Sequence, residues 1–186
     1  MTPFDAALLT PLRHMTYDNR QMTKSGTSMS FLSQYQSPET LPGNEAVRLA
    51  MLLKIQKPSK MDDLSLADSV ARGLSLKSVD AISSFLNTLF PRAIYKIVSE
   101  PTLRRARKRK QHKLTRETSE RVYEISRVID QAARVFHGDT GRIRRFMVRP
   151  NALLEGKTPF EVASSSSAGT NAVVHLLMEA QAGVAV

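Results

Sequence analysis

The residues with the clearest chemistry are the lysines and arginines between Pro101 and Arg116. This stretch carries a net charge of +8 and no acidic residue, within a chain of 186 residues whose net charge is +10. Such a run attracts a polyanion, most often nucleic acid, because each phosphate that it neutralises releases a counterion. Like charges at this density also repel one another, so a merely solvated helix face is the less favourable reading. We therefore expect this run to bind nucleic acid.

RNA is the alternative polyanion for this run. Proteins that read single-stranded RNA stack its bases on aromatic side chains. Only 6% of the residues are aromatic, Trp is absent, and residues 101–116 contain no aromatic side chain. These features favour DNA.

Other reactive side chains do not form a catalytic or metal-binding set. His175 and Glu179 are four residues apart and could share a metal ion, but the pair lacks further ligands and such pairs are more often surface neighbours. The sequence Gly156-Lys157-Thr158 is not a phosphate-binding loop, because Asn151 stands where that loop needs glycine. The serines from Ser164 to Ser167 fit a turn and a helix cap better than a nucleophile. We expect no enzymatic activity and no cofactor.

The absence of cysteine narrows the possibilities further. It excludes a disulfide framework, a cysteine nucleophile and a thiolate metal site, and it suits a reducing compartment. No apolar run approaches the roughly 20 residues of a membrane span, and the N-terminus lacks the pattern of a secretory signal. We expect a cytoplasmic protein with no membrane partner.

The elements that must position the basic run are predicted to be helices. Leu, Ala and Met dominate over Val and Ile, which favours an all-α fold. Ser99 is a predicted N-cap, Glu100 and Pro101 suit the first turn, and Leu103 is expected to point inward. A short helix from Pro91 to Val98 precedes this basic helix. A short helix, a tight turn and a basic helix follow in the order of a helix-turn-helix, whose second helix enters the major groove of DNA.

Further helical patterns precede this motif. Residues 24–42 contain too few regularly spaced apolar residues for a buried face and are predicted to be flexible. Gly73 is a predicted helix stop. The expected helices run from Asn44 to Lys57, from Asp62 or Asp63 to Arg72, and from Ser75 or Ser78 to Leu89.

The helices predicted after the motif have clear caps. Thr115 caps a long helix that ends at Gly138, Asp139 or Thr140 begins the next, and Thr158-Pro159-Phe160-Glu161 is a capping box. A last helix is expected at about residues 168–182. The long helix has an apolar seam with steps of three, four, three and four residues, which is typical of packed helices: Val122, Ile125, Ile129, Ala132 and Phe136.

Four stretches together resemble the antitoxins of the RES–Xre toxin–antitoxin modules, also called the Xre/MbcA/ParS-like family. The last of them is similar to the signature of the family's C-terminal toxin-binding domain and is the most specific. The stretches are Arg72-Gly73-Leu74-Ser75-Leu76-Lys77-Ser78-Val79-Asp80-Ala81, Pro101-Thr102-Leu103-Arg104-Arg105-Ala106-Arg107, Leu114-Thr115-Arg116-Glu117-Thr118-Ser119-Glu120-Arg121 and Pro150-Asn151-Ala152-Leu153-Leu154-Glu155-Gly156-Lys157-Thr158-Pro159-Phe160-Glu161.

The resemblance implies two binding activities and no catalysis. A helix-turn-helix domain would bind operator DNA, and a small helical domain would bind a cognate RES-domain toxin that consumes NAD and cover its active site. The implied protein is a homodimer in the bacterial cytoplasm, associated with the nucleoid when bound to DNA. The implied DNA-binding residues are Thr102, Arg104, Arg105, Arg107, Lys108, Arg109, Lys110 and Lys113. The implied toxin-binding residues are Leu154, Lys157, Phe160, Leu177, Gln181, Gly183 and Val184.

The predicted division of the chain has three parts. Residues 1–60 form a flexible extension with one possible helix, residues 61–137 the helix-turn-helix domain with its long following helix, and residues 138–186 the toxin-binding domain. Gln181 stands where the family commonly has glutamate, so it can offer a toxin only a neutral hydrogen bond, which is weaker than a charged one. The alternative function is a stand-alone helix-turn-helix transcriptional regulator whose C-terminal domain serves for dimerisation.

Overall fold

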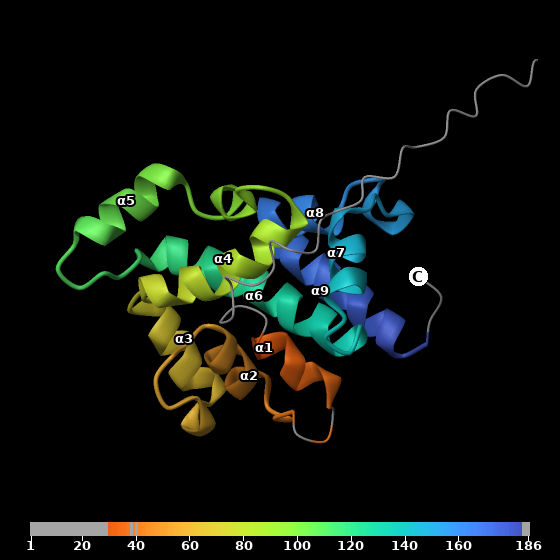
Figure 1. Cartoon of the computed structure of the whole chain (residues 1–186), viewed down its shortest axis with the longest axis horizontal. Helices are drawn as coiled ribbons and strands as arrows, with labels where there is room; N and C mark the ends of the chain where they lie inside the picture. Colours follow the sequence, from red (N-terminus) through yellow and green to blue (C-terminus); the bar gives the residue numbers. More distant parts are fainter. Residues whose placement is uncertain (1–29, 38, 40, 184–186) are drawn as a thin grey trace, which may run out of the picture.

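A computed structural model describes residues 30–37, 39 and 41–183 of the chain (Figure 1). The described residues form helices and no strand, apart from one isolated antiparallel bridge between Ser75 and Lys113. The prediction of an all-helical fold is therefore confirmed. The helices are α1 (Ser30–Ser33), α2 (Glu45–Leu52), α3 (Asp63–Ala71), α4 (Leu76–Leu89), α5 (Glu100–Lys108), α6 (Arg116–Val135), α7 (Thr140–Val148), α8 (Pro159–Ser165) and α9 (Ser167–Gln181), with short 3-10 helices η2 (Gln34–Gln36), η4 (Pro58–Lys60), η5 (Ala93–Lys96) and η6 (Ala152–Leu154).

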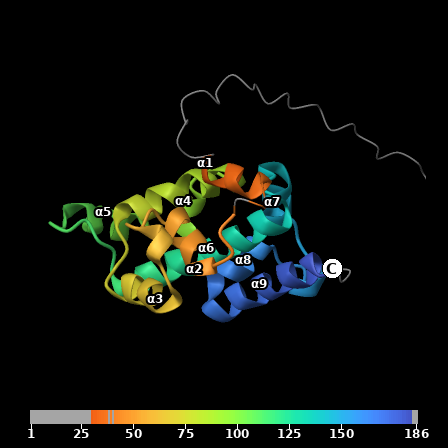
Figure 2. The ribbon, with the colours of Figure 1, turned by 90° about the horizontal axis from the view of Figure 1, so that it is seen from below.

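Helix α6 runs through the middle of the molecule and contacts α2, α3, α4, α7, α8 and α9 (Figures 1 and 2). Four residues of its predicted seam are buried: Val122, Ile125, Ile129 and Ala132. Polar residues of the same helix, among them Asp130 and Gln131, are buried as well. Neighbouring helices therefore cover not only the apolar seam of α6 but also polar residues beside it. Buried residues from Leu32 to Leu177 form one hydrophobic core around it.

The α3–α4 connection is held tightly against the start of α6. Asp62 caps α3, and Gly73 ends it with a φ of +94°, both as predicted. A Cβ atom at Gly73 would lie 2.4 Å from the backbone oxygen of Leu114, so the close approach of these two segments requires glycine. The backbone N–H of Leu74 donates to the hydroxyl of Ser119 on α6 at 2.9 Å.

The short helix predicted from Pro91 to Val98 is instead the 3-10 helix η5, Ala93–Lys96. Arg92 has a φ of +63°, so the backbone cannot form regular α-helix before Ala93. Ile94 and Val98 are buried, as the sequence predicted.

The N-terminal part of the described chain packs on the core. Asn44 caps α2 as predicted, but α2 ends at Leu52 rather than at Lys57 because the backbone enters the left-handed region at Lys54. The predicted flexibility of residues 24–42 is wrong for Leu32 and Tyr35, which are buried in or next to short helices. Of that stretch, residues 24–29, 38 and 40 lie outside the described residues.

Helices α8 and α9 form a closely packed pair that lies against α6. A Cβ atom at Gly169 would lie 2.1 Å from the backbone oxygen of Val162, and the hydroxyl of Thr170 donates to the backbone oxygen of Ala163 at 3.0 Å. Ser166 caps α9, as expected for a residue of the serine run. The C-terminal helices are thus part of the same core as the rest of the chain.

Candidate nucleic-acid and partner interfaces

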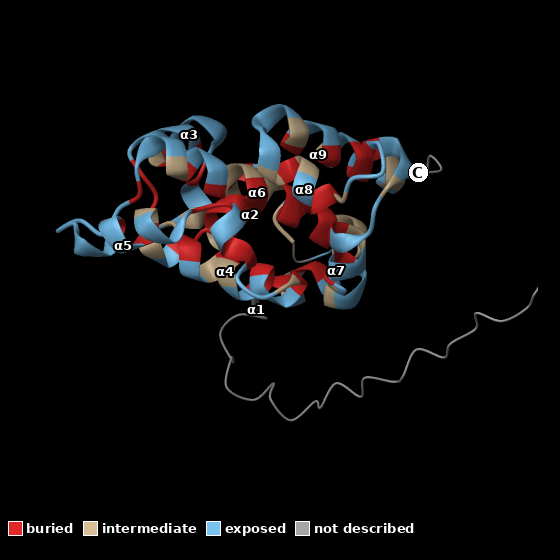
Figure 3. Ribbon diagram, turned by 90° about the horizontal axis from the view of Figure 1, so that it is seen from above, coloured by how far each residue is buried: buried red, intermediate tan, exposed pale blue. Residues whose placement is uncertain are grey.

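Helix α5 is built from its predicted start. The hydroxyl of Ser99 accepts from the backbone N–H of Thr102 at 3.4 Å, and Pro101 lies in the first turn, where its missing N–H costs nothing. Leu103 and Ala106 are buried at 5% and 3% exposure. Only this narrow face of α5 joins the core, and the rest of the helix is open to solvent (Figure 3).

The basic loop after α5 is fixed at its far end. The backbone N–H of Leu114 donates to the backbone oxygen of Leu74 at 2.9 Å, and that of Leu76 donates to the oxygen of His112 at 3.1 Å. Leu114 itself is buried. The α3–α4 connection therefore holds both the loop and the start of α6, which limits the positions that the basic side chains can take.

The predicted DNA-binding residues lie together on α5 and this loop. Thr102 is half-buried, with its hydroxyl 2.8 Å from that of Ser99. The seven lysines and arginines of the set are exposed, and no carboxylate of the described residues lies within ion-pair distance of any of them. By contrast, Arg116 pairs with Glu120 at 2.9 Å. The surface of α5 thus presents cations that no carboxylate in the described part of the chain neutralises.

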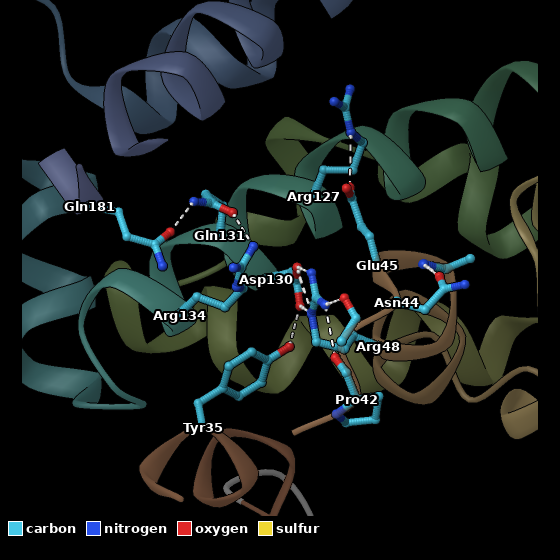
Figure 4. A network of polar contacts seen from close by, with 12 residues as sticks. Tyr35, Pro42, Asn44, Glu45, Arg48, Arg127, Asp130, Gln131, Arg134 and Gln181 are labelled. Atoms are coloured by element: carbon cyan, nitrogen blue, oxygen red, sulfur yellow. Dashed lines mark hydrogen bonds and ion pairs between the residues drawn. The ribbon is translucent and has the colours of Figure 1, made fainter. Parts of the chain in front are cut away.

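A buried polar cluster joins α2 to α6 (Figure 4). Arg48 donates to both carboxylate oxygens of Asp130 on α6, and Tyr35 donates to one of them. Burial by itself lowers the pKa of Arg48, but the hydrogen bonds and charge of Asp130 more than reverse this and raise it. Burial, and then the negative charge of Asp130, raise the pKa of Tyr35. Sequence reasoning did not find this cluster, because its members are up to 95 residues apart.

The C-terminal helices begin with the predicted capping box. Thr158 accepts from the backbone N–H of Glu161, and the carboxylate of Glu161 accepts from the backbone N–H of Thr158 at 2.9 Å. The hydrogen bond from the Thr158 backbone is the main cause that lowers the pKa of Glu161. The box places Phe160 edge-on to the ring of Phe90, with centroids 5.2 Å apart. Helix α8 is thereby joined to the end of α4, just before η5 and α5.

The structure separates the predicted toxin-binding residues into two groups. Phe160, Leu177 and Leu154 are buried in the core, with exposures of 3%, 1% and 9%. Lys157, Gln181 and Gly183 are exposed, and Val184 lies outside the described residues. The side chain of Gln181 accepts a hydrogen bond from Gln131 on α6 at 3.1 Å (Figure 4). Gln181 therefore already has a partner within its own chain.

Exposed apolar side chains in the same C-terminal segment of the chain were missed by sequence reasoning. Val148, Leu153 and Met178 are 36%, 61% and 54% exposed. Exposed apolar side chains such as these are candidates for an interaction surface. The signal in the sequence was a second leucine beside the buried Leu154, but which of the two points outward depends on the path of the η6 turn.

The described residues provide no metal centre. They contain no group of three or more His, Asp or Glu side chains that could hold an ion. His175 and Glu179 form an exposed pair 3.2 Å apart. A groove of about 230 Å³ between α6 and the α8–α9 turn brings acidic side chains and the serine run together, without such a group. No helix of the described part has both the length and the apolar character needed to cross a membrane.

Residues 131–183 match the family model of the antitoxin Xre/MbcA/ParS C-terminal toxin-binding domain. The chain carries an antitoxin toxin-binding domain. This domain begins in the last turns of α6 and includes α7, η6, α8 and α9. A search of proteins with curated functions gave no match.

The identified toxin-binding domain implies binding and neutralisation of a cognate toxin, and it is a non-enzymatic domain. The resemblance seen in Pro150–Glu161 is thereby confirmed. The stretches at residues 72–81, 101–107 and 114–121 lie outside the matched residues, so the helix-turn-helix and its DNA contacts stay predictions. The predicted boundary at residue 138 also stays a prediction.

Proposed function

We propose that this chain is an antitoxin that neutralises a RES-type, NAD-consuming toxin and represses its own operon by binding operator DNA as a homodimer. The family match over residues 131–183 carries the proposal. In it, the toxin-binding domain covers the active site of the toxin, and α5 lies in the major groove of the operator.

The exposed apolar side chains of the toxin-binding domain support the toxin half. On binding, Leu153 and Met178 would each bury apolar surface that is exposed in the free chain. This burial stabilises the complex by about 25 cal/mol per Å² removed from water. Lys157 and Gly183 are also exposed and would supply polar and backbone contacts. Phe160 and Leu177 act from the core by holding α8 and α9 in place rather than by touching the toxin.

The unpaired cations of α5 support the DNA half. Arg104 and Arg105 lie in the middle of this nine-residue helix, where their side chains would meet base edges in the major groove. Lys110 and Lys113 lie on the loop that follows and would contact phosphates. The order η5, turn, α5 is that of a helix-turn-helix, with a 3-10 helix in place of the first α-helix.

The proposal is tested by co-expressing the chain with the product of the neighbouring open reading frame and scoring growth and co-purification together. We expect the neighbour to arrest growth and deplete NAD when expressed alone, and this chain to rescue growth and co-purify with it. A harmless neighbour, or one that does not co-purify, would overturn the proposal and favour the stand-alone regulator.

Point substitutions test the toxin surface better than a truncation. Deleting residues from Pro150 onward would remove α9 from its contact with α6 and disturb the shared core. The double variant Leu153→Ser/Met178→Ser should fold normally and fail to rescue growth. Leu64→Ser is the matched control, because Leu64 is 80% exposed but lies on α3, outside the toxin-binding domain. If both variants rescued growth equally well, Leu153 and Met178 would not contribute to toxin binding.

A further inference from the structure

A cleft in the toxin-binding domain is lined by residues to which the proposed function assigns no role. It has a volume of about 410 Å³ and is lined by Phe136, Arg142, Arg145, Phe146, Arg149, Pro150 and Asn151. The two phenylalanine rings are 5.6 Å apart and form its aromatic part. The cleft thus combines two aromatic rings with three guanidinium groups.

The polar groups of the cleft are mostly hydrogen-bond donors. Arg145 and Arg149 have no carboxylate of the described residues within ion-pair distance, and Arg142 has only Asp139, at 3.4 Å. The side-chain oxygen of Asn151 already accepts from the backbone N–H of Leu153 at 2.8 Å, so its amide group is left as a further donor. A cleft rich in donors and poor in acceptors complements an anion.

The cleft lies away from the basic surface of α5. Helix α5 precedes the start of α6 and α7 follows its end, and they lie toward opposite ends of the molecule (Figures 1 and 2). The twenty residues of α6 span about 30 Å. DNA held in the major groove by α5 therefore does not account for the arginines of α7.

The place of the cleft indicates what would occupy it. All seven lining residues fall within the toxin-binding domain at residues 131–183, and Val148 and Leu153, both exposed, are next to them in the sequence. The N-terminal residues 1–29 are a poor occupant, because they contain three basic and only two acidic residues. A protein surface that buries the apolar residues would bring its own side chains to the guanidinium groups.

We propose that this cleft receives an acidic segment of the cognate toxin, whose Asp or Glu carboxylates pair with Arg145 and Arg149 while an adjoining apolar side chain contacts the phenylalanine rings. The inference rests on the proposed toxin binding. Arginine suits this role because its planar guanidinium group binds a carboxylate through two hydrogen bonds.

Charge reversal at neighbouring positions tests the proposal on the full chain. The variant Arg145→Glu changes the cleft, whereas Arg144→Glu changes the same net charge on the same helix at an exposed residue that does not line it. Affinity for the purified toxin, measured by calorimetry, should fall about 10-fold or more for Arg145→Glu. It should fall less than about 3-fold for Arg144→Glu, and circular dichroism should show both variants folded.

Cross-linking identifies the partner group directly. In the complex with the Arg149→Lys variant, a zero-length carbodiimide should join the amine at position 149 to a toxin carboxylate, and mass spectrometry should place that carboxylate in an acidic segment. The unsubstituted chain should give no cross-link at this position.

Each other outcome overturns the inference in a different way. Equal losses of affinity for Arg144→Glu and Arg145→Glu would mean general attraction without a specific cleft. Loss of operator binding or of dimerisation, with toxin affinity unchanged, would assign the cleft to DNA or to a second copy of the chain. Full toxin affinity in both variants would remove this inference and leave the proposed function standing, whereas no toxin binding by the unsubstituted chain would overturn both.

Discussion

The guanidinium group of Arg48 lies 3.0 Å from the carboxylate of Asp130, and both side chains are almost completely buried, at 4% and 2% exposure. Arg48 also donates to the backbone oxygens of Pro42 and Gly43 at 2.9 and 2.8 Å. One side chain therefore joins the segment before α2 to the C-terminal half of α6. Removing one charge of such a pair leaves the other buried and uncompensated.

We expect Asp130→Asn to lower the free energy of unfolding by about 3–5 kcal/mol. Urea unfolding followed by circular dichroism measures this loss. The control is Arg116→Gln, which breaks the exposed pair with Glu120 and should cost less than about 1 kcal/mol. If both substitutions had the same small effect, Asp130 would not stabilise the chain through a buried ion pair.

Gly73→Ala should destabilise the fold and weaken DNA binding together. Its Cβ atom would meet the backbone oxygen of Leu114 at 2.4 Å, and the positive φ strains any other residue. We expect a loss of about 2 kcal/mol or more in the free energy of unfolding. Two contributions add up to this loss: the backbone strain at position 73 and the displacement of the Leu114 segment. Displacing Leu114 would also release the basic loop that ends there.

The matched control for this substitution is Gly156→Ala. Gly156 also has a positive φ, of +74°, but no atom lies within 4 Å of the position of its Cβ. Urea unfolding should show only the conformational cost of about 1–2 kcal/mol, with unchanged affinity for DNA. A larger loss at Gly156 than at Gly73 would contradict the role given to the Leu114 contact.

The two ends of the basic surface should affect DNA binding differently. Arg104→Ala/Arg105→Ala should reduce the preference for operator over unrelated DNA, because these side chains are proposed to meet base edges. Lys110→Ala/Lys113→Ala should weaken binding to both DNAs equally and lower the salt dependence by about two phosphate contacts. Fluorescence anisotropy over a range of salt concentrations measures both effects. Unchanged operator affinity in the arginine variant would argue against α5 as the recognition helix.

The capping box of α8 should make stability depend on pH below neutrality. The folded pKa of Glu161 is lowered by the backbone N–H of Thr158, so the stabilisation is fully present above the unfolded value of about 4.3 and is lost as pH falls through the folded pKa. Glu161→Gln should therefore have a lower free energy of unfolding than the parent chain at pH 7. This difference should become smaller between pH 5 and pH 3. Urea unfolding at pH 7, 5 and 3 measures it.

Glu155→Gln is the control for this pH dependence. The carboxylate of Glu155 forms an exposed pair with Lys157 at 3.2 Å and does not belong to a capping box, so its replacement should have a smaller effect at pH 7. If the difference in the free energy of unfolding between Glu161→Gln and the parent chain stayed constant from pH 7 to pH 3, the charge of Glu161 would not stabilise α8.

Local patterns in the sequence were enough to predict most helix starts. Ser99, Thr115 and Thr158 cap the helices expected of them, because a cap bonds to a backbone group three residues away and needs no distant partner. The signature in Pro150–Glu161 predicted the toxin-binding domain for the same reason, since its residues are contiguous. The seam of α6 was also visible, because its spacing follows the helical period.

The identity of distant partners, and which apolar side chains of the C-terminal helices are covered, were decided by tertiary structure. Arg48 and Asp130 are 82 residues apart, and nothing in either local sequence distinguishes this arginine from the exposed ones. Phe160 and Leu177 proved to be core residues, whereas Leu153 and Met178 proved to be exposed, because the packing of α8 and α9 on α6 selects which apolar face is covered. The arginine-lined cleft likewise exists only once α7 and the turn after it fold back beside the end of α6.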